Sequence, residues 1–372
     1  MKNMTERLPA VLHVINSLGV GGAERLLSQL VTSQANLGQR VGVLILSSPI
    51  GCFADFTDRV STVATVYVST HSLHDPRQIF DVTHAVRAFQ PNVVHTHLFP
   101  AQLWSALASL LCDRAIAWVT TEHSTWNRRR EVVLLKPFEQ WIYNHYDRVI
   151  SITDAVETAL RTWVKLNESR LAVIPNGIDL SAFQSPERIT KSGQAGFTAI
   201  TLARLEPAKD LVTLLNAVAL ASIDLRLRIV GDGVDRAMLE ALSMQLGIAQ
   251  RVDFLGIRSD VPALLQDADI YVQSSHWEGF SLAVLEGMAA GLPIVASDVP
   301  GLSELVRGHG LLFVQGDAGA LAVHLNRMMV EPESRAHLSE KSLERAREFA
   351  IEGTAAACLA LYIEAAAFKG DR

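Results

Sequence analysis

The stretch SAFQSPERITKSGQAGFTAITLAR, residues 181–204, decides how the chain is divided. Its first part, 181–196, is polar and contains glycine, serine and proline, which is the composition of a linker. Its second part, 197–204, is apolar and β-branched, which is typical of a buried strand. A linker followed by a new strand, halfway along 372 residues, predicts that a second domain begins here.

Short apolar runs alternate with amphipathic segments on both sides of this linker, as in parallel sheets joined by crossover helices. The runs expected to form strands are 10–16, 40–48, 62–69, 92–97, 115–121, 148–153, 197–204, 225–233, 251–256, 268–275, 292–298 and 310–316. We therefore predict an α/β fold of two Rossmann-like, doubly wound domains, 1–180 and 181–350. The helical tail, 351–372, is expected to cross back and pack on the first domain.

The composition excludes several classes of protein. With 49% hydrophobic and 19% charged residues, the chain has the make-up of a soluble globular protein. No apolar run reaches the roughly 20 residues that span a bilayer, and the N-terminus lacks a signal-peptide core, so we expect a cytoplasmic location. A net charge of −6 disfavours nucleic acid as a partner. Cys52, Cys112 and Cys358 lack metal-ligand spacing and are expected to be reduced thiols.

A basic and aromatic segment, residues 127–146, is expected to be helical. It contains the cluster Arg128–Arg130 together with Trp141, Tyr143 and Tyr146. One interpretation is a solvated helix packed on a sheet. The other is a face that approaches an anionic membrane or a lipid-linked substrate.

Loops that follow strands are the expected place for a site, because ligands bind beyond the carboxyl ends of parallel strands. Two facing domains would then share one cleft. After the first strand, NSLGVGGAERLL (16–27) brings Gly19, Gly21 and Gly22 to the start of a helix near Ala23. Free amides at a helix start suit a phosphate or a sugar, but a glycine turn needed only for tight packing is equally consistent.

The first strand of the second domain ends in ARLEPAKDL (203–211). Arg204 and Lys209 can converge on one diphosphate, or they can be two solvated loop cations.

Two glutamates flank the start of a later helix, in EGFSLAVLEG (278–287). Glu278 lies on the loop after a strand, and Glu286 lies about one and a half turns into the helix. Carboxylates accept paired hydrogen bonds from vicinal hydroxyls, so one glutamate can hold a sugar and the other a ribose. The amides expected to form an anion cradle between them are those of Gly279, Phe280, Ser281 and Leu282. Helix capping by Glu278 and an ion pair of Glu286 are the structural alternatives.

Residues 274–306 resemble the signature region of glycosyltransferase family 4, the retaining nucleotide-sugar transferases of GT-B fold. Further stretches agree in order and spacing, namely SLGVGGAERLL, PNVVHTH, TTEH, VIPNGID, ARLEPAKDL and IVGDG. The resemblance covers nearly the whole chain, and it implies that the first domain binds the acceptor and the second the nucleotide sugar.

The resemblance assigns roles in the second domain to particular residues. Glu278 is expected at the donor sugar, Glu286 at the ribose, and Arg204 with Lys209 at the diphosphate. The other expected donor contacts are Gly279, Phe280, Ser281, Leu282, the glycines Gly231 and Gly233, which leave room for the nucleotide, and Ile257 or Arg258, which border the base.

In the first domain the resemblance places Gly22 near the donor phosphates and His123 opposite the transferred sugar. Gly21 and His97 are assigned to the acceptor side. The pair His95 and His97 is interpreted as pointing to opposite faces of its strand, so that no joint metal site is expected. DxD spacing is absent from the expected loops, and we predict no metal and no other cofactor.

The sequence departs from the family pattern at three positions. Ser281 stands where many relatives have glycine, and Ala203 and Asp210 replace a leading and a trailing glycine. No departure removes an expected contact.

The function expected from the resemblance is transfer of a hexose from a UDP or GDP sugar to a glycan hydroxyl, with retention of configuration. A lipid-linked acceptor at the inner face of the cell membrane, in exopolysaccharide or other surface polysaccharide synthesis, is favoured for this soluble chain with its basic aromatic segment. Two alternatives stay open: a nucleotide-sugar epimerase or hydrolase, and a non-catalytic nucleotide-sugar sensor.

Overall fold

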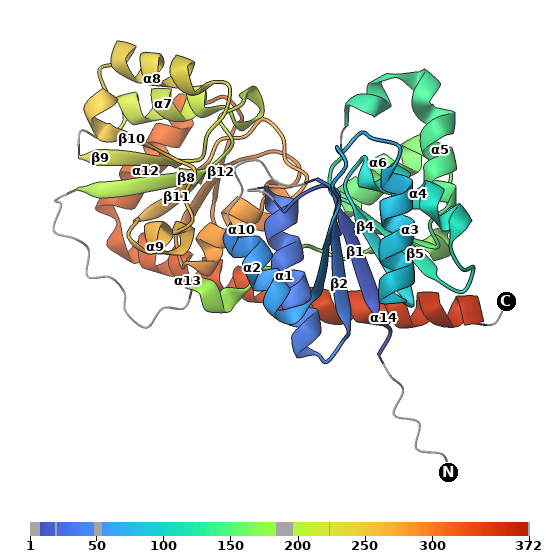
Figure 1. Ribbon diagram of the computed structural model, residues 1–372. Coiled ribbons are helices and arrows are strands. Elements are labelled where there is room, and N and C mark those ends of the chain that lie inside the picture. The colour runs from blue at the N-terminus through green and yellow to red at the C-terminus, as the bar shows by residue number, and fades with distance from the viewer. Residues whose placement is uncertain are drawn as a thin grey trace. The chain divides into compact units, whose positions relative to one another are not determined.

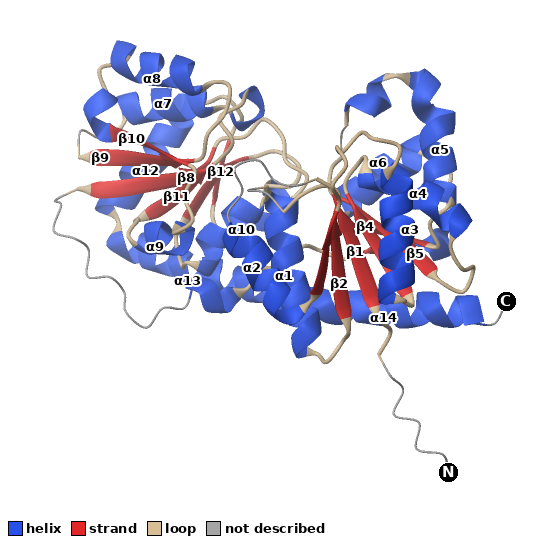
Figure 2. Ribbon diagram, in the orientation of Figure 1, coloured by secondary structure: helices blue, strands red, loops and turns tan. Residues whose placement is uncertain are grey.

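The computed structural model describes residues 8–18, 21–47, 54–125, 127–183, 196–222 and 224–370. The chain divides into two compact units. Unit 1 comprises residues 1–177 and 351–372, and unit 2 comprises residues 178–350. Each unit is a parallel sheet with helices on both faces, so the expected α/β fold of two Rossmann-like domains is confirmed (Figures 1 and 2).

Unit 1 contains a seven-stranded parallel sheet in the order β3-β2-β1-β4-β5-β6-β7. The strands are β1 (Val11–Ile15), β2 (Val41–Ile45), β3 (Thr65–Val68), β4 (Val93–His97), β5 (Ala117–Glu122), β6 (Arg148–Ser151) and β7 (Leu171–Val173). The helices are α1 (Gly22–Asn36), α2 (Ala54–Val63), α3 (Gln78–Phe89), α4 (Ala101–Ala108), η1 (Ser109–Leu111), η2 (Arg128–Glu131), η3 (Val133–Leu135), α5 (Lys136–Asn144), α6 (Asp154–Trp163), η4 (Glu168–Arg170) and α14 (Ile351–Gly370).

The two faces of the unit 1 sheet are covered by different helices. Leu12, Val14 and Val94 point to the face that packs against α3, α4 and α5. The opposite face lies against α1 and α14. Because both faces are buried, β1 and β4 consist of buried residues throughout, although His13, His95 and His97 are polar.

Unit 2 contains a six-stranded parallel sheet in the order β10-β9-β8-β11-β12-β13. The strands are β8 (Phe197–Leu202), β9 (Leu225–Val230), β10 (Val252–Gly256), β11 (Ile270–Gln273), β12 (Ile294–Ser297) and β13 (Leu311–Phe313). The helices are η5 (Leu180–Phe183), η6 (Pro207–Lys209), α7 (Leu211–Leu220), α8 (Arg236–Gln245), η7 (Ala249–Arg251), α9 (Val261–Gln266), α10 (Leu282–Ala289), α11 (Ser303–Val306), α12 (Ala318–Val330) and α13 (Pro332–Glu348).

Every expected strand is present, but the boundaries differ. The run 62–69 begins inside α2, and β3 starts only at Thr65. Strand β7 was not expected, since its three residues lie in a longer apolar stretch that offers no clear period. The segment expected to be one helix, 127–146, is two 3-10 turns followed by α5.

The chain passes between the units at residues 177/178 and 350/351. A Cβ on Gly177 would lie 2.8 Å from the Cα of Ile351, so the chain can approach α14 here only as glycine. Of the expected linker 181–196, residues 184–195 lie outside the described residues.

Helix α14 begins at the residue where the chain re-enters unit 1, and it lies against α1, β4 and β5 of that unit (Figure 1). By length and composition alone it could cross a membrane, so the statement that no stretch is long enough was wrong by that criterion. Its buried residues, Ile351, Ala355, Cys358, Leu361, Tyr362 and Ala365, follow helical spacing and form one face. A helix that buries one face against a sheet is an ordinary part of a domain core.

Candidate functional site

Glu278 lies on the loop that follows β11, at the carboxyl edge of the unit 2 sheet. Its Oε1 accepts hydrogen bonds from Lys209 Nζ at 2.7 Å, Ser275 Oγ at 2.8 Å and Gln273 Nε2 at 3.3 Å. The carboxylate is only 11% exposed and its lysine partner 17%. This carboxylate is therefore held rigidly, by donors from two different loops.

Glu286 lies on α10 and is 7% exposed. The helix begins at Leu282, after the N-cap Ser281, whose side chain accepts from the amide of Val284 at 3.3 Å. Burial, together with the charges of Glu286 and Glu278, raises the pKa of the Tyr271 hydroxyl. The Tyr271 hydroxyl donates to Gln273 Oε1 at 2.8 Å, and Gln273 Nε2 donates to Glu278, so this tyrosine belongs to the hydrogen-bond network of Glu278.

Arg204 and Lys209 are both ion-paired to glutamates. The Arg204 guanidinium contacts Glu206 at 2.9 Å and is 75% exposed, whereas Lys209 contacts Glu278. Lys209 ends the short turn η6, and Ser274 Oγ donates to its carbonyl at 3.0 Å. The sequence predicted the two cations, but not Glu206 as the partner of Arg204, nor Ser275 and Gln273 as donors to Glu278.

The glycines of the IVGDG stretch are required by neighbouring backbone. A Cβ on Gly231 would lie 2.0 Å from the Ala203 carbonyl oxygen, and one on Gly233 would lie 2.3 Å from that of Leu205. The contact that the structure shows for these glycines is with the 203–205 loop, and their proximity to a nucleotide stays a prediction. Nearby, Ile257 is 51% exposed and Arg258 pairs with Asp260 at 2.7 Å.

Three histidines share one buried face of the unit 1 sheet. His13 is in register with His95, and the rings of His95 and His97 are 4.2 Å apart. The interpretation that His95 and His97 point to opposite faces was wrong, because residues two apart on a strand point to the same face. Both lie under α1 and α14, and neither is more than 3% exposed.

These histidines are joined by hydrogen bonds. His13 Nδ1 lies 3.0 Å from His97 Nε2, and His13 Nε2 lies 2.8 Å from Gln34 Oε1. His95 Nδ1 lies 2.6 Å from the Tyr362 hydroxyl and its Nε2 lies 2.7 Å from Thr121 Oγ1. Burial lowers the pKa of His13 to about 4 and those of His95 and His97 well below the usual value. The cluster is therefore neutral.

The same three histidines are the described group best placed to bind a metal, since their ligand atoms lie within 4.8 Å of one another. Five of their six ring nitrogens, however, already lie within hydrogen-bonding distance of a partner in the network just described. A metal would have to displace these partners, and the cluster fits a satisfied polar core better than a cofactor site.

His123 directly follows β5 at the carboxyl edge of unit 1. Its Nε2 is buried without a hydrogen bond, and burial lowers the pKa of His123 to about 4. The imidazole is neutral at physiological pH and acts as a hydrogen-bonding group rather than a cation. Its ring centroid is 5.9 Å from that of His97.

Two arginines expected to face solvent or a membrane turn inward instead. Arg130 donates to Glu122 Oε2 at 3.0 Å and is 8% exposed, while Arg129 bonds to the buried Glu139. Two apolar side chains of this segment are strongly exposed instead, Val133 at 73% and Leu134 at 88%. The sequence does not show which acidic residues lie next to these arginines in the folded chain.

Gly21 is the N-cap of α1, with extended backbone, and Gly22 is its first residue. A Cβ on Gly21 would meet the Glu24 carboxylate, which is the far end of a flexible side chain. Gly19 lies outside the described residues.

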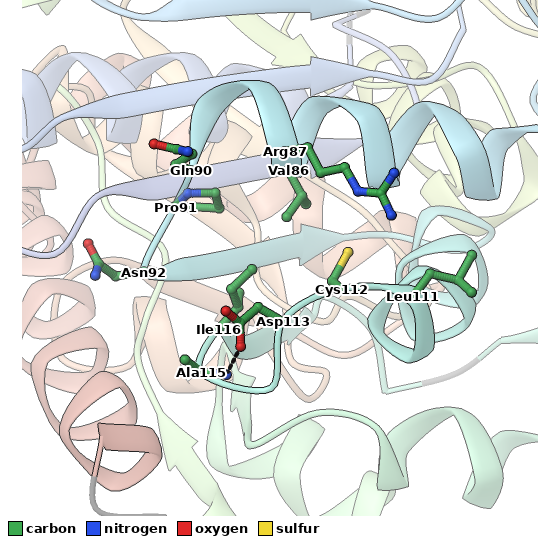
Figure 3. A pocket seen from close by; sticks show the side chains of 10 residues that line it. All are labelled: Val86, Arg87, Gln90, Pro91, Asn92, Leu111, Cys112, Asp113, Ala115 and Ile116. Atoms are coloured by element: carbon green, nitrogen blue, oxygen red, sulfur yellow. Dashed lines mark hydrogen bonds between the residues drawn. The ribbon is translucent and has the colours of Figure 1, made fainter.

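A groove lies at the opposite, amino-terminal edge of the unit 1 sheet, where β4 and β5 begin (Figure 3). Its lining includes Arg87 and Gln90 from the end of α3, and Asp113, which accepts from the amide of Ala115 at 2.9 Å. Because ligands of parallel sheets bind at the carboxyl edge, this groove is separate from the candidate site.

Two family models match the chain. Glycosyltransferase Family 4 matches residues 20–182, and Glycosyl transferases group 1 matches residues 187–345. The chain belongs to glycosyltransferase family 4. The suspected family is thereby confirmed, and the two Rossmann-like units are those of the GT-B fold.

Relatives of this glycosyltransferase differ in what they act on. A D-inositol 3-phosphate glycosyltransferase of Corynebacterium urealyticum is 28% identical, covering 82% of this chain and 80% of the relative. The UDP-Gal:alpha-D-GlcNAc-diphosphoundecaprenol alpha-1,3-galactosyltransferase of Escherichia coli is 24% identical, covering 70% of this chain and 72% of the relative. The structure of Anabaena Alr3699/HepE in complex with UDP and glucose is similar, with a TM-score of 0.81 and 22% sequence identity. The similarity covers 94% of this chain and 98% of the Anabaena chain.

Two of the three departures from the family pattern have structural explanations in this glycosyltransferase. Ser281 caps α10, which a glycine could not do through a side chain. Asp210 caps α7 in the left-handed conformation, at φ 45°, that a glycine would adopt without strain.

Proposed function

We propose that this glycosyltransferase takes its sugar from a nucleoside diphosphate donor, a UDP or GDP sugar, bound at the carboxyl edge of unit 2. The observation that carries the proposal is the ion pair of Lys209 and Glu278, buried where two strand-following loops meet. Structural neighbours solved with UDP and with UDP-glucose support a nucleotide-sugar substrate.

Each polar group of this site has a proposed role. Glu278 accepts hydrogen bonds from hydroxyls of the donor sugar, and Glu286 accepts them from the ribose. Lys209 and Arg204 neutralise the diphosphate, since a guanidinium and an ammonium are suited to phosphate oxygens. The amides at the start of α10 add a cradle for the donor, formed by Gly279, Phe280, Ser281 and Leu282, and Ile257 and Arg258 border the base.

In unit 1 we propose that Gly22 lies near the donor phosphates and that His123 hydrogen-bonds the transferred sugar through its buried ring nitrogen. Gly21 and His97 belong to the acceptor side. A neutral His123 suits a sugar hydroxyl, because an imidazole offers one donor and one acceptor.

We propose transfer with retention of configuration. The bond between the anomeric carbon and the diphosphate oxygen breaks, the acceptor oxygen bonds to that carbon on the same face, and the acceptor proton passes to the departing phosphate. Negative charge develops on the diphosphate, so cations that hold it more tightly as it leaves lower the barrier. The chain's own cations supply this charge, and the proposal needs no metal.

For the acceptor we propose a lipid-linked glycan used in surface polysaccharide synthesis, reached from the cytoplasmic face of the membrane. The relative from Escherichia coli, whose name specifies a diphosphoundecaprenol acceptor, supports this choice. The exposed apolar pair Val133 and Leu134 gives unit 1 a means of contacting lipid, in place of the inward-facing arginines.

The Lys209–Glu278 pair provides the test. Lys209→Met and Glu278→Gln should each lower transfer from UDP or GDP sugars by more than tenfold, about 1.4 kcal/mol or more of transition-state stabilisation. Each single change also leaves a partly buried charge without its partner, so thermal stability should fall. The double variant restores neutrality and should regain stability without regaining turnover.

Near-normal transfer by either single variant contradicts the assignment. Hydrolysis or isomerisation of the donor without an acceptor indicates an epimerase or hydrolase instead. Tight donor binding with no turnover under any condition indicates a sensor.

A further inference from the structure

Asp210 combines two unusual features beside the proposed donor site. Its backbone is left-handed, at φ 45° and ψ 47°, a conformation that residues other than glycine, asparagine and aspartate rarely adopt. Its Oδ1 accepts from the Thr213 amide at 3.3 Å, but its Oδ2 is buried without a hydrogen-bond partner. The side chain is only 7% exposed, so the unpaired oxygen calls for a donor.

The Nδ1 of His276 lies 3.6 Å from that oxygen. The His276 amide donates to the Ala208 carbonyl at 2.8 Å, which fixes the histidine beside the turn that carries Lys209. Gln315 contacts the same Nδ1 at 2.7 Å. A proton on Nδ1 would replace this hydrogen bond and could be donated to Asp210 Oδ2 instead.

The charge balance of the site gives this histidine a function. Both cations assigned to the diphosphate, Arg204 and Lys209, already face a glutamate. A donor diphosphate with two negative charges must therefore displace these pairs or meet additional positive charge. His276, 34% exposed and next to the Lys209 turn, is the group in that position that can become a cation.

We propose that Asp210 positions His276 to take up a proton from solvent when the nucleotide sugar binds. Nδ1–H then donates to Asp210 Oδ2 and Nε2–H donates to a phosphate oxygen of the leaving group. A carboxylate close to an imidazole favours its protonated form. The other groups around His276 are Lys209, which opposes this protonation, Glu278, which favours it, and the uncharged Gln315 and Trp277. The inference rests on the proposed function of the same site.

The experiment is calorimetric titration with UDP-glucose and with GDP-mannose at about pH 7.5, in two buffers of different ionisation enthalpy. A nucleotide sugar has no group of its own that titrates near this pH, so any proton taken up belongs to the protein. We expect uptake of up to about one proton, and affinity about tenfold higher at pH 6 than at pH 8.

His276→Gln should abolish both the proton uptake on binding and the pH dependence of the affinity. Asp210→Asn, which keeps the cap and tolerates the left-handed backbone, should reduce both. The double variant should bind no more weakly than His276→Gln, because Asp210 acts through the histidine. His309→Gln, a change at a partly exposed histidine elsewhere in unit 2, is the control and should behave as the wild type.

Binding without proton uptake, or the same uptake in His276→Gln, overturns this inference and leaves the donor site intact. Failure of the wild type to bind either nucleotide sugar overturns the proposed function and the inference together.

Discussion

At the scale of single residues, the candidate site depends on how closely backbone segments approach the loop that carries Glu278. Gly301 has φ +82°, and a Cβ there would lie 2.5 Å from the Glu278 carbonyl and 3.0 Å from that of Gly279. The glutamate therefore owes its position to a glycine that follows β12, as well as to its hydrogen bonds. The signature stretch contains this glycine, but its partner could be identified only in the folded chain.

Gly301→Ala should displace the Glu278 loop and weaken nucleotide-sugar binding by about tenfold or more, with a loss of stability of about 2–4 kcal/mol. Gly308→Ala is a matched control, because Gly308 has the same φ of +82° and nothing within 4 Å of an added Cβ. The control should lose only about 1–2 kcal/mol of stability, from the backbone strain, and should bind the nucleotide sugar normally. Equal binding by the two variants, measured by titration calorimetry, would contradict the role of Gly301.

At the scale of elements, α14 is tied to the unit 1 sheet by polar contacts as well as apolar ones. Tyr362 meets His95 Nδ1 at 2.6 Å and accepts from Gln34 Nε2 at 3.4 Å. Strands β1 and β4 thus carry histidines at positions that a parallel strand normally fills with aliphatic residues, because α1 and α14 supply partners for them. The network links the C-terminal helix to elements far away in the sequence.

Tyr362→Phe should destabilise unit 1, because it leaves a buried histidine nitrogen without its partner. We expect a loss of about 1–3 kcal/mol in the free energy of unfolding, measured by denaturant titration with an unchanged slope. The neighbouring Ile363, 46% exposed, provides the comparison, and Ile363→Ala should change stability by less than about 0.5 kcal/mol. A change of similar size in both variants would show that the hydroxyl contributes nothing.

At the scale of the whole molecule, the chain leaves unit 1 after residue 177 and returns to it at residue 351. A complete second unit is inserted between β7 and α14, so unit 1 is finished only by the last helix. This topology makes each unit a separate sheet with its own carboxyl edge, which agrees with separate proposed roles for acceptor and donor. The proposed membrane contact belongs to unit 1 alone.

That contact predicts a specific loss of lipid association. Val133→Ser with Leu134→Ser removes the two most exposed apolar side chains of the η2–η3 segment, and binding to vesicles of anionic lipid should fall by about tenfold or more. Val330→Ser, at an equally exposed valine of α12 in unit 2, is the control and should leave flotation unchanged. No association of the wild type with vesicles would remove the membrane contact from the proposal.

The sequence by itself determined most of the strands, their order and the division into two sheets, because these depend on local apolar periodicity and on a polar interruption near residue 190. It also determined that Glu278, Arg204 and Lys209 follow strands, and therefore lie at a carboxyl edge.

Only the tertiary structure decided which side chains meet. It paired Lys209 with Glu278, turned Arg129 and Arg130 toward Glu139 and Glu122, and placed the Ala203 carbonyl against Gly231. The physical reason is that these ion pairs and close backbone contacts join residues from 8 to 69 positions apart in the sequence. Their partners are chosen by the packing of whole elements, which no local pattern encodes.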